Sequence, residues 1–167
     1  MSVTVRRIRP DEGELLRRVR LAALSDSPAA FGSTYSRELL LSDDEWADRA
    51  RCSASGSERA LFFAVDEGES VVGLAGGYRP DGTASDVELI SMWTDPSARR
   101  SGVGRQLVDA VIEWSRSVGA KRVDLWVTKG NEPAERLYRA TGFVETGDCQ
   151  PLPSDPCRDE LRMSLVV

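Results

Sequence analysis

Hydrophobic and polar residues alternate in several short runs of the chain, and these runs predict strands. Such alternation places successive side chains on opposite faces of a sheet. The predicted strands cover residues 3–9, 60–65, 70–78, 86–94, 122–128, 143–146 and 160–166. In the run at 86–94, strict alternation predicts one face with Val87, Leu89, Ser91 and Trp93, and an opposite face with Glu88, Ile90, Met92 and Thr94.

Hydrophobic residues three and four positions apart predict helices between these strands. Helices are expected at 11–24 and at about 36–52, the second in one or two pieces. A third begins at Val103 and ends at Gly119, and a fourth is capped by Asn131 and ends near Gly142. Turns are expected at 79–85 and at the proline-rich stretch 149–157. The resulting order, β-α-α-β-β-β-α-β-α-β-β, predicts an α/β fold with one mixed sheet flanked by helices.

The composition is that of a soluble globular protein, and we expect residues 1–167 to form a single domain. The hydrophobic share is 41% and the charged share 29%. We expect a cytoplasmic protein with no membrane partner, because no apolar run reaches the length of a membrane span and the first residues lack a signal peptide core. The net charge of −5 argues against nucleic acid as a partner and weakly favours cationic partners such as amines.

The absence of histidine narrows the possible chemistry further. The usual zinc sites and the Ser-His-Asp arrangement are excluded, and we expect no metal. The chain has three cysteines, an odd number, so free thiols are expected, and an interaction between Cys149 and Cys157 is left open.

The clearest chemical feature is the loop at 99–104, Arg-Arg-Ser-Gly-Val-Gly, which opens directly into the third predicted helix. Glycines let the backbone approach a ligand, and the first turn of a helix offers unpaired amides with positive partial charge. Arg99, Arg100 and Arg105 add charge that can pair with phosphates. The loop matches neither the Walker A motif nor the dinucleotide fingerprint. It predicts a pyrophosphate site, with a plain strand-to-helix turn as the other interpretation.

Together with a second block downstream, this loop resembles the GCN5-related N-acetyltransferase (GNAT) family along essentially the whole chain. The family signature Arg/Gln-x-x-Gly-x-Gly/Ala is met at 99–104, and Asp95-Pro96 just ahead of it is also usual. The second block runs from Asn131 to Tyr138 and is followed by Gly142-Phe143. Arg100 is a departure, because glycine is more usual there; the backbone cradle stays intact if the φ angle of Arg100 is negative.

The resemblance implies a GNAT-type fold and an acetyl-CoA-dependent N-acetyltransferase. A primary amine of an unidentified small-molecule or peptide acceptor would attack the thioester directly. Backbone groups of Met92, Trp93 and Thr94 would pair with the pantetheine arm of acetyl-CoA. The pyrophosphate would be held by the amides of Arg100, Ser101, Gly102, Val103, Gly104 and Arg105. Asn131 would contact the pantetheine region, or it would only cap its helix.

Two residues are expected to move protons. By the resemblance, Tyr138 would protonate the leaving thiolate, its alternative role being helix packing. An alkylammonium must lose a proton before it attacks, and in a chain without histidine a carboxylate is the natural base. The resemblance assigns this role to Glu88, whose expected neighbours Ile90 and Met92 give it a partly apolar setting. A water relay, or a Glu88 that is merely paired with an arginine, is the alternative.

The acceptor is expected between the segments 27–34, which includes Phe31, and 150–157, in which Asp155 is the only charged residue. Another branch of the family carries a glutamate where this chain has Trp126, so Trp126 is expected to be a wall of the acceptor site or part of the core. Two other functions stay open: a non-catalytic acyl-CoA-binding sensor or structural module, and a phosphate-binding enzyme that uses nucleotides. A monomer and a homodimer are equally compatible with the sequence.

Overall fold

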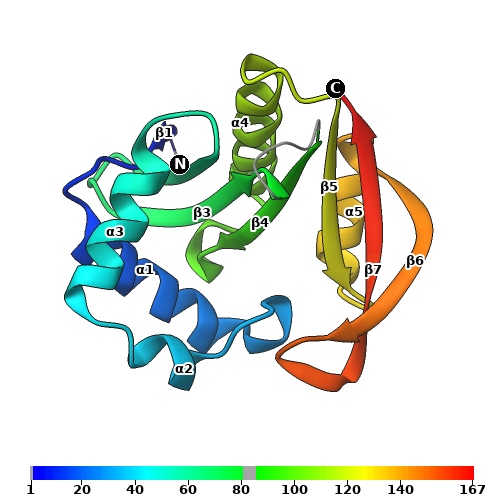
Figure 1. Cartoon of the computed structure of the whole chain (residues 1–167), viewed down its shortest axis with the longest axis horizontal. Coiled ribbons are helices and arrows are strands. Elements are labelled where there is room, and N and C mark those ends of the chain that lie inside the picture. The colour runs from blue at the N-terminus through cyan, green and yellow to red at the C-terminus, as the bar shows by residue number, and fades with distance from the viewer. Residues whose placement is uncertain (1, 81–85) are drawn as a thin grey trace.

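A computed structural model describes residues 2–80 and 86–167, which form one seven-stranded sheet with helices on both faces (Figure 1). The elements in chain order are β1 (Val3–Arg7), α1 (Gly13–Asp26), the 3₁₀ turn η1 (Pro28–Ala30), α2 (Tyr35–Leu39), α3 (Asp43–Ala54), β2 (Arg59–Asp66), β3 (Val71–Tyr78), β4 (Asp86–Thr94), the 3₁₀ turn η3 (Pro96–Ala98), α4 (Val103–Ser117), β5 (Arg122–Thr128), α5 (Glu132–Ala140), β6 (Val144–Leu152) and β7 (Asp155–Val166).

This order confirms the predicted α/β fold, with the second helical region in two pieces. A capping box starts α3: Ser42 accepts a hydrogen bond from the backbone amide of Glu45, whose side chain accepts one from the amide of Ser42. The expected turn at 79–85 lies outside the described residues from position 81 on. No helix in the described part of the chain is long and apolar enough to cross a membrane.

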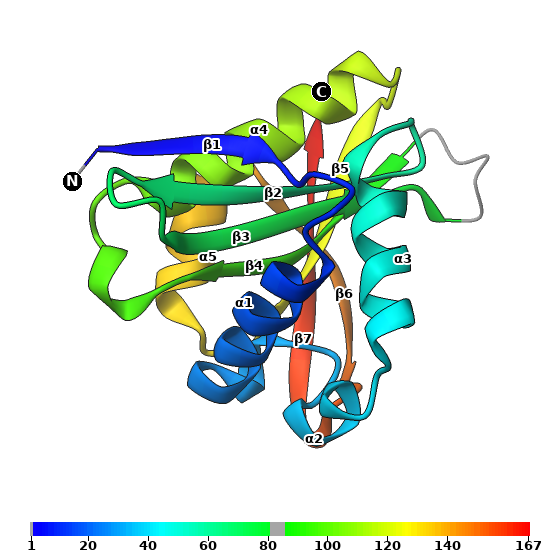
Figure 2. The ribbon, with the colours of Figure 1, turned by 90° about the vertical axis from the view of Figure 1, so that its left-hand side faces the viewer.

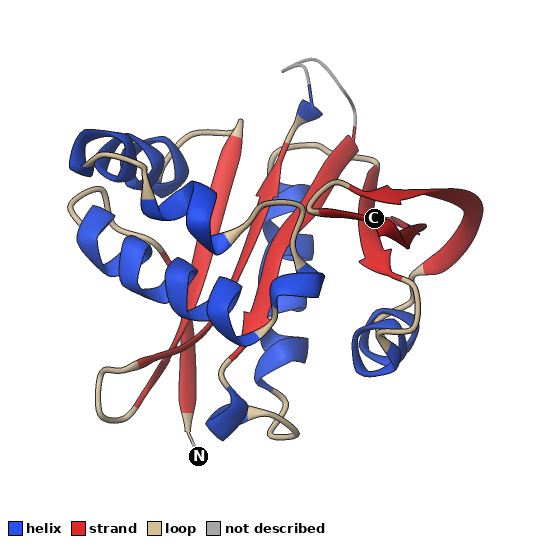
Figure 3. Ribbon diagram, turned by 90° about the horizontal axis from the view of Figure 1, so that it is seen from below, coloured by secondary structure: helices blue, strands red, loops and turns tan. Residues whose placement is uncertain are grey.

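The strands lie in the order β1-β2-β3-β4-β5-β7-β6, so β7 is inserted between β5 and β6. Neighbouring strands are antiparallel except β4 and β5, which run parallel. Helices α1 and α3 cover one face, and α4 and α5 cover the other (Figures 2 and 3). Each face therefore has its own hydrophobic core. Trp46, Phe63 and Trp93 are buried on the first face, and Leu107 and Val111 on the second.

A β-bulge at Ser91 breaks the alternation in β4. On β3, Leu74 and Gly76 are two residues apart, but their partners Trp93 and Ile90 on β4 are three apart. Ser91 takes up the extra residue with a φ angle of 59°, in the left-handed region.

The bulge overturns the predicted division of faces. Val87 and Leu89 lie in the core beneath α4, whereas Trp93 lies in the core beneath α1 and α3. Glu88 thus shares its face with Ile90 but not with Met92, which packs on the α4 side. Periodicity could not show this, because one extra residue in a strand reverses the orientation of every side chain after it.

The parallel strands β4 and β5 pair over only three residues. Residues 86–88 are in register with residues 122–124, and no further pair follows within the described residues. Beyond this point the strands diverge, as the widening space between β4 and β5 in Figure 1 shows. This divergence opens the sheet at the carboxyl end of β4.

The proline-rich stretch at 149–157, predicted as a loop, is mostly strand. β6 and β7 form a hairpin joined by Pro153 and Ser154. Pro151 is tolerated in β6 because that strand is an edge strand, with β7 as its one neighbour in the described sheet. The last two strands are therefore longer than the sequence suggested, and their turn reaches the loop after α1.

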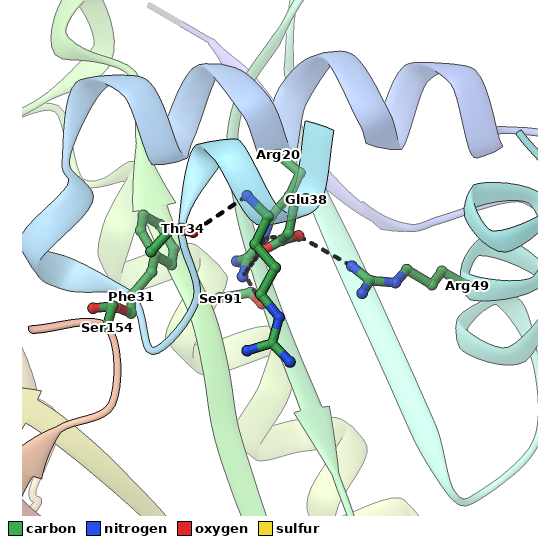
Figure 4. Close-up of polar contacts among 8 residues, drawn as sticks. Arg20, Phe31, Thr34, Glu38, Arg49, Ser91 and Ser154 are labelled. Atoms are coloured by element: carbon green, nitrogen blue, oxygen red, sulfur yellow. Dashed lines mark hydrogen bonds and ion pairs between the residues drawn. The ribbon is translucent and has the colours of Figure 1, made fainter. Parts of the chain in front are cut away.

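A buried ion pair fastens α1 and α2 to the bulge (Figure 4). Arg20 of α1 donates from Nε and Nη2 to the carboxylate of Glu38 in α2, at 3.0 Å each. Its Nη1 donates to the hydroxyl oxygen of Ser91 at 3.1 Å, and Arg49 of α3 adds a bond of 3.1 Å to Glu38. Burial raises the pKa of Glu38, but hydrogen bonds from Arg20 and Ser33 and the charges of both arginines outweigh this effect and lower it overall.

We expect Glu38→Gln to reduce the free energy of unfolding by about 3 to 5 kcal/mol at neutral pH, because it leaves two guanidinium groups without their buried partner. A carboxylate with a lowered pKa in the folded state stabilises above its unfolded pKa, near 4.5, and loses this contribution as the pH falls through the folded pKa. Wild type should therefore lose more stability than Glu38→Gln below that pH, as measured by urea unfolding. Glu67→Gln, at an exposed turn position, is the control. If the free energy of unfolding depended on pH equally in wild type and Glu38→Gln, the stabilising role of the Glu38 carboxylate would be contradicted.

Candidate active site

A cavity of about 780 Å³ occupies the space between β4, β5, α5 and the N-terminus of α4. Its volume is within the usual range for small-molecule sites. Most of the residues predicted to bind acetyl-CoA line it: Met92, Trp93, Thr94, Arg99, Arg100, Gly102, Gly104, Arg105 and Asn131. Tyr138, predicted as a catalytic residue, lines it as well. Ser101 and Val103 are not among its lining residues. Val103 is 1% exposed and packs in the core, so its backbone amide is what it can offer.

The edge of β4 that faces β5 supplies one wall of this cavity. Because pairing with β5 stops at Glu88, residues 89–94 have no strand partner on that side within the described chain. Such an edge can hydrogen-bond an extended ligand as an added strand would. Trp93 contributes through its backbone, because its indole lies on the far face and donates from Nε1 to Asp26 at 3.0 Å.

The N-terminus of α4 supplies the second wall. Gly102 is the N-cap residue with a φ angle of 84°, and the first turn contains no acidic residue. Its unpaired amides and positive partial charge suit a phosphate group. A Cβ atom at Gly104 would lie 3.2 Å from the side chain of Leu137 and 3.4 Å from that of Met92. Glycine at 104 thus lets α4 pack closely against α5 and β4 while it borders the cavity.

Arg100 has a φ angle of 60°. The negative φ angle that was expected to keep the backbone cradle intact is therefore not found. It occupies the left-handed region that a glycine adopts without cost, which explains why glycine is more usual there. The chain keeps the loop conformation and accepts the strain of a side chain at this position.

The arginines around the cavity fall into two groups. Arg99 donates from Nε to the carbonyl of Thr94 at 3.0 Å and pairs with Asp26, and Arg105 pairs with Asp109 at 3.0 Å. These guanidinium groups are engaged by the protein.

Arg100 and Arg136 form the second group. Both are exposed at the cavity and have no hydrogen bond or ion pair within the described residues. Arg136 was not among the residues predicted from the sequence. The signal was available, because Pro133, Arg136 and Ala140 recur at helical spacing on one face of α5 and all line the cavity.

Asn131 and Tyr138 flank the cavity from the two ends of α5. Asn131 caps the helix by accepting a bond of 3.4 Å from the amide of Ala134, and it lines the cavity as well, so its two proposed roles are compatible. Tyr138 is only 5% exposed and packs edge-on against Phe143, with ring centroids 5.9 Å apart. Burial raises the pKa of Tyr138, which keeps the phenol protonated at neutral pH.

A second cavity, of about 500 Å³, lies on the other side of the bulge. Its walls contain both residues predicted to bind the acceptor, Phe31 and Trp126, together with the predicted base Glu88. The two cavities share Ala30, Leu89, Ile90, Ser91 and Trp126. They therefore adjoin one another at the bulge.

Hydrogen bonds hold the outer wall of the second cavity. Ser154 in the turn between β6 and β7 donates from its hydroxyl to the carbonyl of Phe31, and Thr128 of β5 donates to the carbonyl of Ala29 at 2.6 Å. Figure 4 shows Ser154 beside Phe31. The structure thus brings together the two segments expected to border the acceptor.

The charged groups of this cavity differ from those expected. Asp155 is not among the lining residues and pairs with Arg158. Three other titratable residues, Arg20, Tyr78 and Glu160, line the cavity and were given no role from the sequence. They come from three different elements, α1, β3 and β7, so only the sheet order and register bring them together.

The carboxylate of Glu88 accepts a hydrogen bond from the hydroxyl of Tyr78, its cross-strand partner on β3. No arginine forms an ion pair with Glu88 within residues 2–80 and 86–167. This removes the alternative in which Glu88 is a strand-end carboxylate paired with an arginine.

Comparison with known proteins agrees with this geometry. A model of the acetyltransferase (GNAT) family matches residues 21–143. The chain is 29% identical over 143 residues to mycothiol acetyltransferase of Actinosynnema mirum. The aligned region covers 85% of this chain and 44% of that relative. It spans less than half the length of the curated relatives that it matches first.

Solved structures show the same fold. An acetyltransferase of the GNAT family from Streptococcus pneumoniae superposes with a TM-score of 0.79 at 21% identity, over 99% of each chain. PaiA N-acetyltransferase from Thermoplasma acidophilum in complex with coenzyme A gives 0.78 at 16% identity, over 100% of each chain. The predicted fold class is thereby confirmed.

The left-handed conformation of Arg100 predicts that Arg100→Gly stabilises the protein by about 1 kcal/mol at most, since relief of the side-chain strain exceeds the entropy cost of glycine. Arg100→Ala keeps a Cβ atom at the same φ angle and should bring no gain. Urea unfolding of the two variants separates backbone strain from loss of charge. The idea fails if Arg100→Gly is no more stable than Arg100→Ala.

Proposed function

The chain belongs to the acetyltransferase (GNAT) family, and we propose that it transfers an acetyl group from acetyl-CoA to a primary amine. The observation that carries this proposal is the meeting of two cavities at the Ser91 bulge. One has phosphate-binding features, and the other places a carboxylate, Glu88, in its wall. Donor and acceptor would each occupy one cavity and react where the cavities join.

The first cavity has the features that acetyl-CoA requires. The open edge of β4 from Met92 to Thr94 would pair with the pantetheine arm, and the amides at the start of α4 would hold the pyrophosphate. Arg100 and Arg136, whose guanidinium groups have no protein partner in the described chain, would pair with further phosphate oxygens. Asn131 would contact the pantetheine arm while it caps α5. When bound, acetyl-CoA supplies an activated acetyl group as a thioester.

Residues of the protein would then carry out the proton transfers. Glu88 takes a proton from the acceptor ammonium, with its carboxylate oriented by Tyr78. The freed amine attacks the thioester carbonyl, so that a C–N bond forms and the C–S bond breaks. Tyr138 would give its proton to the departing thiolate, and the phenolate so formed would take the second proton from the attacking nitrogen, which leaves a neutral amide and a free thiol. Phe31 and Trp126 form apolar walls around the acceptor.

The remaining expectations from the sequence stay predictions. We propose that residues 1–167 act as a single acetyltransferase domain. We also propose a cytoplasmic location, and either a monomer or a homodimer. A non-catalytic acyl-CoA-binding module is the outcome to be expected if acetyl-CoA binds but no amine is acetylated.

Glu88→Gln tests the proposed base. We expect kcat at neutral pH to fall by about 10²- to 10⁴-fold and to recover partly at high pH, where more of the amine is already deprotonated. Thiol release from acetyl-CoA measures turnover, and the thermal shift on adding acetyl-CoA should be unchanged. Glu67→Gln serves as the matched control. A Glu88→Gln enzyme with the turnover of wild type at every pH would eliminate Glu88 as the base.

Tyr138→Phe tests the proposed acid. Burial raises the pKa of Tyr138, so the phenol is protonated at neutral pH and is present as a proton donor when the thiolate departs. The variant keeps the ring packed against Phe143 but cannot donate, so kcat should fall by about 10²- to 10⁴-fold while KM for acetyl-CoA changes little. Steady-state kinetics separate the two constants. A raised KM with an unaltered kcat would assign Tyr138 to binding instead.

A further inference from the structure

Two carboxylates face the second cavity, one more than a proton transfer requires. Glu88 comes from β4 and Glu160 from β7, and the sheet order places β5 between these strands. Glu160 is 7% exposed, although it belongs to a strand whose neighbouring residues are mostly accessible. A carboxylate buried to this degree needs a hydrogen bond or a counter-ion.

Each carboxylate is oriented by one neighbour and keeps one oxygen for a ligand. The hydroxyl of Tyr78 donates to Oε2 of Glu88, and Nε2 of Gln150 donates to Oε1 of Glu160 at 2.6 Å. No donor within residues 2–80 and 86–167 is hydrogen-bonded to Oε1 of Glu88 or to Oε2 of Glu160. The cavity therefore presents two carboxylate oxygens, in fixed positions, that can accept hydrogen bonds from a ligand.

Among the described residues, the lining of the second cavity contains no cation that neutralises these two charges. Arg20 is the one basic residue among the lining residues, and its guanidinium group is paired with Glu38. Arg162 lies near the cavity, 5.7 Å from the ring of Trp126, but it pairs with Asp124 at 2.8 Å. A bound monoamine would bring one positive charge to two carboxylates.

We propose that Glu160 binds a second positive charge of the acceptor, so that the preferred substrate is a primary amine that carries a further cationic group. The proposal rests on the acetyl transfer proposed above. Glu88 would receive the reacting ammonium, and Glu160 would hold the other cation beside the aromatic ring of Trp126, which favours such a charge. Glu160 is thus a specificity residue that does not itself take part in proton transfer.

The electrostatics of the empty pocket support this assignment. Burial raises the pKa of Glu160, the hydrogen bond from Gln150 opposes the rise, and the charge of Glu88 adds to it. The two carboxylates therefore repel one another, and a dication relieves this repulsion while it replaces the missing counter-ions.

Three amines with the same carbon backbone and different charge provide the test: diaminobutane, butylamine and aminobutyrate. Thiol release should give wild type the highest kcat/KM with diaminobutane and the lowest with aminobutyrate. Glu160→Gln should lower the ratio of kcat/KM for diaminobutane over butylamine by about 10- to 100-fold, the range for a hydrogen bond to a charged group. Glu67→Gln, at an exposed position away from both cavities, should leave the ratio unchanged.

Two results would overturn the proposal: a wild-type enzyme that uses butylamine as well as diaminobutane, or a Glu160→Gln enzyme that keeps the wild-type ratio. Loss of turnover with all three amines in Glu160→Gln, recovered at high pH, would instead make Glu160 the base and equally refute the proposal. If wild type releases no thiol with any of the three amines, the proposed function fails for these acceptors. Calorimetry of diaminobutane and butylamine binding to wild type and Glu160→Gln would then still decide the role of Glu160.

Discussion

The short pairing between β4 and β5 is the constraint on which both cavities depend. Three paired residues hold the strands together at one end, and the bulge at Ser91 turns β4 away from β5 beyond them. Continuous pairing would satisfy the backbone of β4 internally and would close the sheet where a ligand is to bind. The fold thus leaves hydrogen-bonding groups open along one strand edge, and a bound pantetheine arm would satisfy them.

The bulge at Ser91 is held in place by contacts from the helices α1 and α2. Arg20 contacts the hydroxyl of Ser91 and is itself fixed by Glu38, so α1 and α2 are tied to the one irregular point of β4. The guanidinium of Arg20 also lies over the ring of Phe31, 4.7 Å from its centroid. One buried ion pair therefore positions both the junction of the cavities and an apolar wall of the second cavity. It supports the proposed site although it does not take part in the proposed proton transfers.

Local signals were sufficient to predict the element order, and most of the residues predicted to bind acetyl-CoA line one cavity. Gly102, Gly104, Asn131 and Tyr138 lie close together in short sequence blocks, and each block maps onto one strand-loop-helix unit of the fold. The acceptor side could not be predicted in the same way. Glu160 meets Glu88 only through the strand order β4-β5-β7, which periodicity does not encode, and the bulge shifted register within a run that looked regular.

The two cavities also differ in the sign of their charge, and this difference would determine which substrate enters which cavity. The first cavity combines the N-terminus of α4 with the arginines at positions 100 and 136, whereas the second presents Glu88 and Glu160. In the proposed reaction, this difference would disfavour phosphates in the second cavity and ammonium groups in the first, so each substrate would be favoured in its own cavity. Since the cavities join at Ser91, this separation would bring the amine and the thioester together with the correct orientation. The net charge of −5 conceals this polarity, because what matters for the reaction is the distribution of charge along the path between the two cavities.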